Sequence, residues 1–334
     1  YAAVVRAAAL DGFRPRGDVI FAGVADEESG SSLGVEWLTE HHLDLIDADF
    51  LLTESGGIPV GDRDPVPGAA DAIRRPLGVT VTVGEKGLAR RRLVVHGTPG
   101  HGSAPWGSDN AAVRAAEAVT RLTRFAPPTQ IGEYWPRYVH ALGFTGDVAA
   151  RLTNPDDLVG SLDAVGDLAG YVHAITHTTI APTIIRAGDA INVIPGEASV
   201  DLDIRHLPGE TPESIDAHLR LALGDLMDHI DIVSLGFSKS SVSPLDTALY
   251  RTIAEVIDEA YPGAQPLPII AAGGSDARFY RWRGRVAYGF SVLGPDWDYG
   301  TFRHLIHGND ERIDVDSVAR TARAIHSLVR RFQG

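Results

Sequence analysis

The sequence predicts an α/β protein of two domains, in which an α+β domain interrupts the first domain and the chain then returns to it. Three observations support this prediction. The 334 residues are 44% hydrophobic, which suffices for a large core and two domains. Apolar strands alternate with helical stretches up to residue 53. Residues 87–240 follow a different order, namely strand, helix, two strands, helix and strand.

The first domain is predicted to comprise residues 1–86 and 241–334. Its first part is expected to form a helix, a strand, a helix and a strand, at 1–10, 18–24, 32–42 and 49–53. Its second part is expected to form a helix, two strands and a helix, at 244–260, 268–270, 286–290 and 315–332. The 18–24 strand is short, apolar and rich in β-forming residues. This alternation is typical of a βαβ layer, whose active sites lie just past the carboxyl ends of its strands.

The α+β domain is predicted to span residues 87–240. A strand at 89–95 alternates Arg with apolar residues and leads into a glycine-rich turn at 97–102. The remaining elements are a helix, two strands, a helix and a strand, at 110–124, 179–186, 198–204, 211–223 and 231–236. Prolines divide the segment 125–180 into short pieces, so we expect a mostly helical insertion there.

Composition excludes several classes of function. The net charge is −14 and no basic run occurs, so we expect no nucleic-acid partner. No apolar stretch reaches the length of a membrane span. The sequence has no Cys, which excludes disulfides and thiolate metal sites. Any bound metal must therefore use carboxylates and some of the 13 His residues.

Two adjacent carboxylates, Glu27 and Glu28, follow the predicted 18–24 strand directly. At the end of a buried strand the two carboxylates repel each other, and a bound cation or a shared proton usually relieves this repulsion. The alternative is a helix N-terminus, where acidic side chains complement the helix dipole. Glu54 also follows an apolar strand, and it either converges with this pair or caps a turn. His307 suits zinc as a neutral imidazole, although His304 competes with it and a lone His is more often only hydrogen-bonded.

The predicted α+β domain contributes further candidates. His101 lies on the glycine-rich loop, and Asn192 and Arg205 flank two predicted strands. An Arg and an Asn directed at one place suit a substrate carboxylate, because Arg offers a bidentate fork. The alternative is an ordinary surface pair. In the first domain, the backbone amides of Gly273-Gly274 in the run Gly-Gly-Ser-Asp form either an anion nest or a simple turn.

Four motifs in this order resemble the M20 family of metallopeptidases and amidohydrolases, which includes carboxypeptidases, aminoacylases, carnosinases and succinyl-diaminopimelate desuccinylases. The motifs are Ala25-Asp26-Glu27-Glu28-Ser29-Gly30, Gly100-His101-Gly102-Ser103-Ala104-Pro105, Asn192-Val193-Ile194-Pro195-Gly196 with Asp203-Ile204-Arg205, and His307-Gly308 with Glu311-Arg312. The resemblance covers nearly the whole chain except residues 125–180. It implies a zinc-hydrolase-type catalytic domain with a mixed sheet flanked by helices. A ferredoxin-like α+β lid and dimerisation domain interrupts that catalytic domain.

The resemblance also implies roles for the candidate residues. Glu27 is expected to be the general base, and Glu28 to bind one zinc while Glu54 and His307 bind the other. His101 is expected to reach the active site of a neighbouring subunit and stabilise the oxyanion. The remaining candidates are expected to hold the substrate: Asn192, Arg205, Gly273 and Gly274.

One part of the family pattern has no match in this sequence. The His-x-Asp motif and the bridging Asp of the family precede the position that matches Tyr1. Residues 1–10 moreover read as the middle of a helix without an initiator Met or a cap. We therefore expect the complete protein to bind two zinc ions per subunit, with cobalt or manganese as alternatives. The chain by itself is expected to bind metal weakly or not at all, and we expect a cytoplasmic location.

The expected function is metal-dependent hydrolysis of an amide or peptide bond in a small carboxylate-bearing substrate, either a peptide or an N-acyl amino acid. The expected assembly is a homodimer formed through the lid domain. Two alternatives stay open. One is a catalytically incomplete M20-like fragment that serves binding or dimerisation. The other is a metal-free acid/base hydrolase that uses Glu27 and Glu28.

Overall fold

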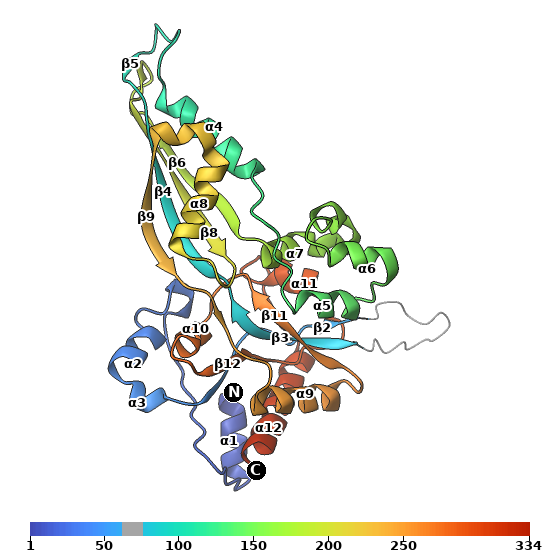
Figure 1. Ribbon diagram of the computed structural model, residues 1–334. Helices are drawn as coiled ribbons and strands as arrows, with labels where there is room; N and C mark the ends of the chain where they lie inside the picture. The colour runs from blue at the N-terminus through green and yellow to red at the C-terminus, as the bar shows by residue number, and fades with distance from the viewer. Residues whose placement is uncertain (62–75) are drawn as a thin grey trace. The chain divides into compact units, whose positions relative to one another are not determined.

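A computed structural model describes residues 1–61 and 76–334 of the chain (Figure 1). It divides into two compact units. The first unit contains Tyr1–Glu85, Ile131–Val172 and Val242–Gly334, and the second contains Lys86–Gln130 and His173–Ser241. Among the described residues, no helix combines the length and the apolar character needed to cross a membrane.

The first unit is built on a six-stranded mixed sheet. Its central strand β3 (Gly78–Glu85) pairs in parallel with β11 (Gln265–Ala271) and antiparallel with β2 (Pro59–Val60). On its other side β3 meets β12 (Val286–Gly289), which runs parallel to β1 (Phe50–Thr53). The short strand β10 (Ser241–Val242) ends the sheet.

The central strand β3 is missing from the sequence prediction. All eight of its residues are buried, and Val79, Val81 and Val83 enter the main core. Thr80 and Thr82 occupy the other face and are buried as well. The Val-Thr alternation resembles a half-exposed strand in sequence, because only the neighbouring elements show that both faces are covered.

The predicted strand at 18–24 is wrong. This segment has no regular structure, and Val19, Ile20 and Phe21 are 37%, 45% and 52% exposed. β-Forming side chains favour a strand only where a neighbouring strand supplies hydrogen bonds and packing, and no described strand pairs with this segment. The helices and the other strands predicted for the first domain are present within a few residues of the expected bounds.

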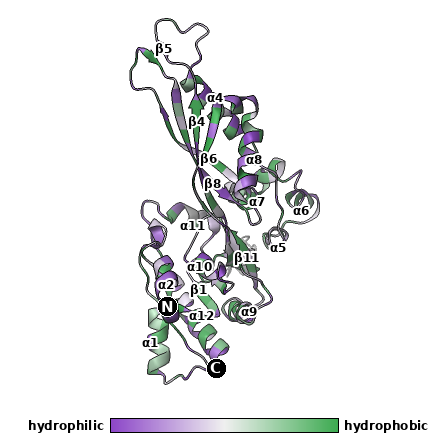
Figure 2. Ribbon diagram, turned by 60° about the vertical axis from the view of Figure 1, so that its left-hand side comes forward, coloured by the Kyte–Doolittle hydropathy of each residue, from purple (hydrophilic) through white to green (hydrophobic). Residues whose placement is uncertain are grey.

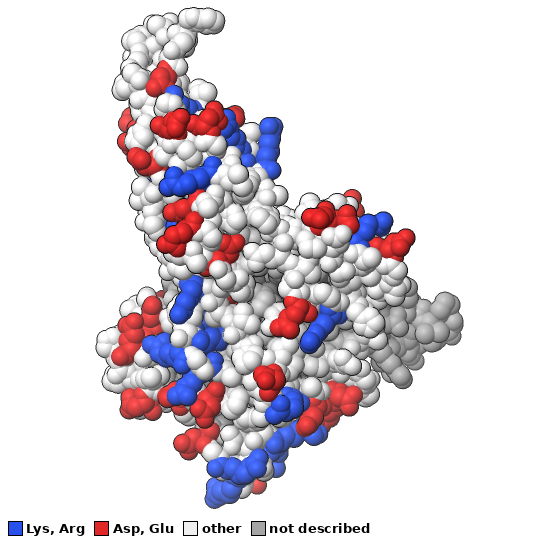
Figure 3. Space-filling view, viewed as in Figure 1, with Lys and Arg blue, Asp and Glu red and all other residues white. Residues whose placement is uncertain are grey.

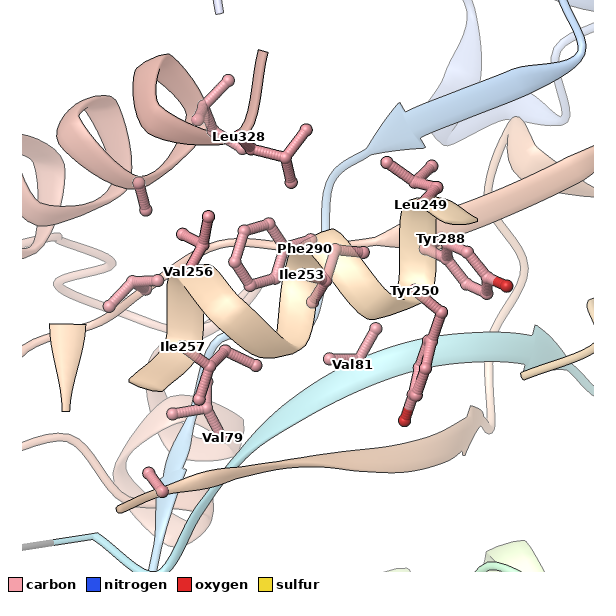
Figure 4. Close-up of a cluster of buried hydrophobic side chains, with 14 of the residues drawn as sticks. Val79, Val81, Leu249, Tyr250, Ile253, Val256, Ile257, Tyr288, Phe290 and Leu328 are labelled. Carbon is pink, nitrogen blue, oxygen red and sulfur yellow. The ribbon is translucent and has the colours of Figure 1, made fainter. Parts of the chain in front are cut away.

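Three helices pack with β3 and β12 to form the main core. These are α1 (Ala2–Leu10), α9 (Ala248–Ala260) and α12 (Val315–Gln333), and α1 is hydrophobic along most of its length (Figure 2). Ile253 of α9 points toward Phe290 in the centre of this cluster (Figure 4). A smaller cluster joins α2 (Val35–His41), α3 (Leu43–Ile46) and α10 (Ala277–Arg281). The last helix of the unit is α11 (Tyr299–Leu305).

Residues 131–172 form short helices and belong to the first unit, although in sequence they lie inside the span predicted for the second domain. The elements are α5 (Trp135–Ala141), α6 (Gly146–Leu152), the 3₁₀ segment η2 (Val159–Leu168) and α7 (Ala169–Thr176), which continues into the second unit. The Trp135 indole is buried and donates to the Leu152 carbonyl at 2.7 Å, so this aromatic side chain serves packing.

The second unit is a four-stranded antiparallel sheet in the order β6-β8-β4-β9, with two helices on one face. Its strands are β4 (Gly87–His96), β6 (Thr179–Ala187), β8 (Glu197–His206) and β9 (Ile230–Ser238). Helix α4 (Ala111–Arg124) begins at the cap Asn110, and α8 (Pro212–Leu223) begins at a capping box of Thr211 and Ser214. A 3₁₀ turn η3 (Gly224–His229) follows α8, and the pair β5 (Gly100–His101) and β7 (Val193–Ile194) lies at one end. The chain order β-α-β-β-α-β confirms the predicted ferredoxin-like α+β domain.

We predict that Ile253→Ala lowers the free energy of unfolding by about 2–5 kcal/mol, because it leaves a cavity at a fully buried position. Val318→Ala is the control, since Val318 lies on α12 with 54% of its surface exposed, and its effect should stay within about 0.5 kcal/mol. Urea denaturation of both variants measures the difference. Equal losses would contradict the assignment of the core.

Candidate active site

A tight turn carries the acidic pair. Glu27 and Glu28 lie in a 3₁₀ turn, η1 (Glu27–Ser29), which Asp26 and Ser31 enclose with left-handed φ values of 69° and 72°. The Asp26 carboxylate accepts a hydrogen bond from the Leu33 amide at 2.9 Å. Glu27 is half-buried and Glu28 is exposed, so both carboxylates remain accessible to a ligand.

Glu54 follows β1 at the carboxyl end of that strand. The next three residues, Ser55, Gly56 and Gly57, all have left-handed φ values, of 75°, 72° and 83°. A Cβ at Gly56 would lie 2.6 Å from the Gly289 carbonyl oxygen, so this close turn requires glycine. The turn ends the strand abruptly and leaves Glu54 at the edge of the sheet.

His307 approaches the acidic turn from the C-terminal part of the chain. It follows α11 with a left-handed φ of 55°, and its Nε2 lies 3.7 Å from a Glu28 carboxylate oxygen. Both side chains are exposed, by 67% and 76%, so their mutual attraction contributes little to stability. The structure therefore places His307 beside the acidic turn of Glu27 and Glu28, and burial and then the charge of Glu28 raise the pKa of Glu54.

A buried ion pair holds the loop 273–276. Arg281 donates to the Glu85 carboxylate at 2.9 Å, and both side chains are nearly fully buried. The same carboxylate accepts hydrogen bonds from the Ser275 amide at 2.8 Å and the Ser275 hydroxyl at 2.5 Å. The Glu85 carboxylate at the end of β3 therefore joins the loop 273–276 to this strand.

This loop in turn holds the acidic turn. The Ser31 hydroxyl donates to Asp276 at 2.6 Å, and Arg278 donates to the Gly30 carbonyl at 3.1 Å. A Cβ at Gly274 would lie 2.6 Å from the Arg278 guanidinium, whereas nothing surrounds a Cβ at Gly273. The sequence analysis missed Asp276, although it directly follows the Gly-Gly-Ser run that the analysis noted.

Burial, and then the charges of neighbouring carboxylates, raise several pKa values. The pKa of Glu27 is raised to about 7, first by partial burial and then by the charges of Glu54, Asp276 and Glu28. The pKa of Glu54 is also raised, by burial and by Glu28 and Asp276. Burial raises the pKa of Asp276, against the hydrogen bond from Ser31. Such a site favours a bound proton or a cation.

The donor set of this region has the right chemistry for zinc. Glu28 and Glu54 offer carboxylate oxygens, and His307 offers an imidazole nitrogen, which are ligand types that zinc accepts. In residues 1–61 and 76–334, however, no three His, Asp or Glu side chains converge into a group that could hold a metal ion. Two of these donors, Glu28 and His307, lie 3.7 Å apart.

The candidates in the second unit lie at two different ends of the sheet. His101 and Asn192 lie together, because β5 pairs with β7 and the Gly102 amide donates to the Asn192 carbonyl at 2.7 Å. Arg205 lies at the opposite end of β8 and pairs with Asp203 at 2.7 Å. At about 3.3 Å per residue, the two ends are on the order of 25 Å apart. Within one chain the structure therefore separates Asn192 from Arg205 along β8.

Lys86 is buried beside Arg205. Its ammonium donates to the carbonyls of Ala174 and His177 at 2.7 and 2.8 Å, and to the Thr179 hydroxyl at 3.3 Å. Burial lowers the pKa of Lys86 to about 7, the charge of Arg205 lowers it further, and Asp203 opposes the shift.

Comparison with known proteins connects this geometry to a family. Residues 83–230 match the peptidase dimerisation domain of the M20 family. The chain is 26% identical over 315 residues to the N-fatty-acyl-amino acid synthase/hydrolase of Xenopus tropicalis, covering 92% of this chain and 58% of that protein. It is 24% identical over 323 residues to the probable carboxypeptidase S-like 2 of Dictyostelium discoideum, covering 96% and 60% respectively. The chain thus spans little more than half the length of these relatives.

A solved structure shows the same fold. The M20 family metallo-carboxypeptidase of Sulfolobus solfataricus matches with a TM-score of 0.60 at 18% identity, over 92% of this chain and 69% of that one. Together with the matched dimerisation domain, this confirms the predicted fold class and the predicted resemblance.

We predict that the contribution of Lys86 to stability rises with pH between about 7 and 10.5, because Lys86 loses its proton early in the folded state and late in the unfolded state. The gain is at most about 1.4 kcal/mol per pH unit from this group. Lys86→Met should flatten the profile in this window. Lys239→Met is the matched control, since Lys239 is exposed and is the only other lysine in the sequence. Chemical denaturation at pH 7 and 9.5 tests this, and an unchanged slope in Lys86→Met would contradict it.

Proposed function

Because this chain is a relative of the M20 metallopeptidases, we propose that it forms the larger part of a metal-dependent hydrolase. Its substrate would be a peptide or an N-acyl amino acid with a free carboxylate, cleaved at the amide bond. The observation that carries the proposal is the 3.7 Å contact of Glu28 with His307, together with the electrostatic interaction of Glu54 with both and with Glu27, from three separate segments of the first unit. Structural packing alone does not explain why carboxylates that raise one another's pKa are gathered at an exposed edge.

Glu28, Glu54 and His307 would hold the metal, which in the complete protein we propose to be two zinc ions per subunit. Cobalt and manganese also suit such nitrogen and oxygen donors. When bound, the metal supplies polarisation of the substrate carbonyl and a water molecule of lowered pKa. The exposed pair Glu28–His307 can close around a cation by side-chain rotation alone, since neither side chain is packed.

Glu27 would act as the general base. It would accept a proton from the attacking water and then pass that proton to the leaving amine. A carboxylate suits both steps when its pKa lies near the working pH, and the pKa of Glu27 is raised to about 7. The hydrogen bonds from Ser31 to Asp276 and from Arg278 to the Gly30 carbonyl hold the turn that carries this carboxylate.

Four further residues are proposed to act on the substrate, namely Arg205, Gly273, Gly274 and His101. Arg205 would donate two parallel hydrogen bonds to the substrate carboxylate. To do so it would release the two hydrogen bonds that it now donates to Asp203. The open surroundings of Gly273 leave room for the substrate backbone, so the Gly273-Gly274 turn would form one wall. His101 would stabilise the oxyanion, which contributes on the order of 3 kcal/mol per donor.

We propose a homodimer in which His101 and Asn192 of one copy serve the active site of the other. This follows from the separation of these residues from Arg205 along β8. The edge strand β6 suits the dimer contact, because Ile184 and Ile185 are 42% and 56% exposed on it.

Two alternatives remain, namely a metal-free acid/base hydrolase that uses Glu27 and Glu28, and a binding or dimerisation module without catalysis. The observation that favours both is that the described residues contain no complete group of three metal ligands. Metal content and turnover together separate the three proposals.

We predict that the full natural protein holds about two zinc ions per chain and hydrolyses dipeptides or N-acyl amino acids. Glu27→Gln should reduce kcat by about 10²–10⁴-fold and leave the metal content unchanged, because it removes the base and no ligand. Elemental analysis and a substrate panel measure both quantities, with exposed Glu40→Gln as the control. Turnover without metal would favour the acid/base hydrolase, and metal-free protein without turnover would favour the binding module.

We also predict complementation between inactive copies. His101→Ala and Glu27→Gln proteins should each have little activity alone. Mixed dimers contain one site with an intact Glu27 that receives an intact His101 from the other copy. A one-to-one mixture after subunit exchange should therefore regain about a quarter of the wild-type activity. No recovery, with mixed dimers demonstrated by mass spectrometry, would show that His101 does not act between copies.

A further inference from the structure

The ammonium of Lys86 is buried and donates its hydrogen bonds to neutral groups. The residue is 5% exposed, and its acceptors are the carbonyls of Ala174 and His177 and the hydroxyl of Thr179. An ammonium has three hydrogen atoms, so these acceptors use all of them. On the visible face of the second unit, by contrast, Lys and Arg side chains lie among Asp and Glu side chains (Figure 3). Burial of a charge that contacts no anion costs stability, so packing alone does not explain why lysine occupies this position.

The backbone places Lys86 on the same face of the sheet as Arg205, within the second unit. Lys86 lies two positions before Leu88, and Leu88 pairs with Arg205 across β4 and β8. Side chains two positions apart, and side chains of directly paired residues, point to the same face of a sheet. Thr179 of β6 also pairs with Arg205, and the Thr179 hydroxyl accepts the hydrogen bond from Lys86. The ammonium therefore lies beside Arg205, on the face opposite to α4 and α8.

When Lys86 is protonated, two cations share one anion at this end of β8. Arg205 donates twice to the Asp203 carboxylate, at 2.7 and 3.2 Å, and both side chains are about one-third exposed. Glu85 precedes Lys86 but supplies no second anion, because its carboxylate pairs with Arg281. A ligand carboxylate on Arg205 would therefore balance the remaining positive charge. Such a ligand can reach the exposed Arg205 but not the buried Lys86, so Lys86 acts on it only through its charge.

We propose that Lys86 is a positioning residue for the substrate carboxylate, because its buried ammonium strengthens the hold of Arg205 on that carboxylate without touching the substrate. This inference rests on the proposed function, in which Arg205 binds the carboxylate. It adds a second cation to the recognition of the substrate. It also makes Lys86 the group that sets the preference for an ionised carboxylate over an otherwise identical neutral amide.

The protonation state of Lys86 then controls this preference. The pKa of Lys86 is lowered to about 7, first by burial and then by the charge of Arg205, and Asp203 opposes the shift. A bound carboxylate favours the charged ammonium, so binding raises this pKa and takes up a proton above pH 7. The affinity for the carboxylate is therefore highest below pH 7 and falls as the pH rises above it. The neighbouring imidazoles are neutral in this range, because burial lowers the pKa of His177 to about 4 and also lowers that of His173.

The test uses the full natural protein and two substrates that differ only in the carboxylate, namely an N-acyl amino acid and its carboxamide. The ratio of their kcat/KM values cancels the titration of Glu27 and of the metal site, which both substrates share. In the wild type this ratio should fall on the order of ten-fold between pH 6 and 9. Lys86→Met should show the low ratio at both pH values, and Lys86→Arg, which stays charged, the high ratio at both. Lys239→Met, at an exposed position, is the matched control and should behave as the wild type does.

Two further measurements separate an action through Arg205 from a merely structural role. In an Arg205→Met background, Lys86→Met should change the ratio by less than about two-fold, because the group through which it acts is gone. Glu27→Gln protein should bind the N-acyl amino acid at pH 8 with uptake of protons, measured by calorimetry in buffers of different ionisation enthalpy. Adding Lys86→Met should reduce that uptake.

Three results would overturn the inference while the hydrolase stands. They are a wild-type ratio that does not change with pH, equal losses for acid and amide in Lys86→Met, and proton uptake that Lys86→Met leaves unchanged. A wild type that cleaves neither substrate nor any dipeptide would overturn the proposed function and this inference with it.

Discussion

The buried ion pair between Glu85 and Arg281 is the contact on which the candidate site depends. Both side chains are almost completely removed from water, so either charge alone would be strongly destabilising. The Glu85 carboxylate also accepts hydrogen bonds from the amide and the hydroxyl of Ser275. Because Glu85 ends the fully buried central strand β3, that strand fixes the loop 273–276 directly.

The acidic turn requires that support. Asp26 and Ser31 both adopt left-handed backbone conformations, which cost on the order of 1 kcal/mol each for residues other than glycine. Burial of Ser31 and its hydrogen bond to Asp276 offset this cost. The repulsion among Glu27, Glu28 and Glu54 adds to it. The turn is strained and concentrates negative charge, and its hydrogen bonds with Asp276 and Arg278 hold it. The carboxylates of Glu27 and Glu28 take no part in these bonds and stay accessible to a cation.

Much of this arrangement was predictable, and the failures have physical causes. Periodicity located α4, α9 and α12, whose apolar stripes are independent of context. The same reasoning failed for 18–24, since an apolar β-rich run forms a strand only beside a partner, and for β3, whose burial on both faces depends on distant segments. Motifs identified Glu27 and His307 as candidates. They did not reveal that Asp276 and Arg278 hold the acidic turn, because those contacts join residues about 245 positions apart.

The second unit has two chemically different ends, and β8 fixes the distance between them. One end holds Lys86, Asp203 and Arg205. The other end, which we call the tip, comprises residues 98–108 and 190–196, includes His101 and has no Asp, Glu, Lys or Arg. Strand β6 runs from the charged end to the tip, since Thr179 pairs with Arg205 and Ala187 with Ala198. Two copies joined along β6 by a two-fold axis would place these strands antiparallel. Each tip would then lie at the charged end of the other copy, so the proposed dimer would bring His101 of one copy and Arg205 of the other toward the same place.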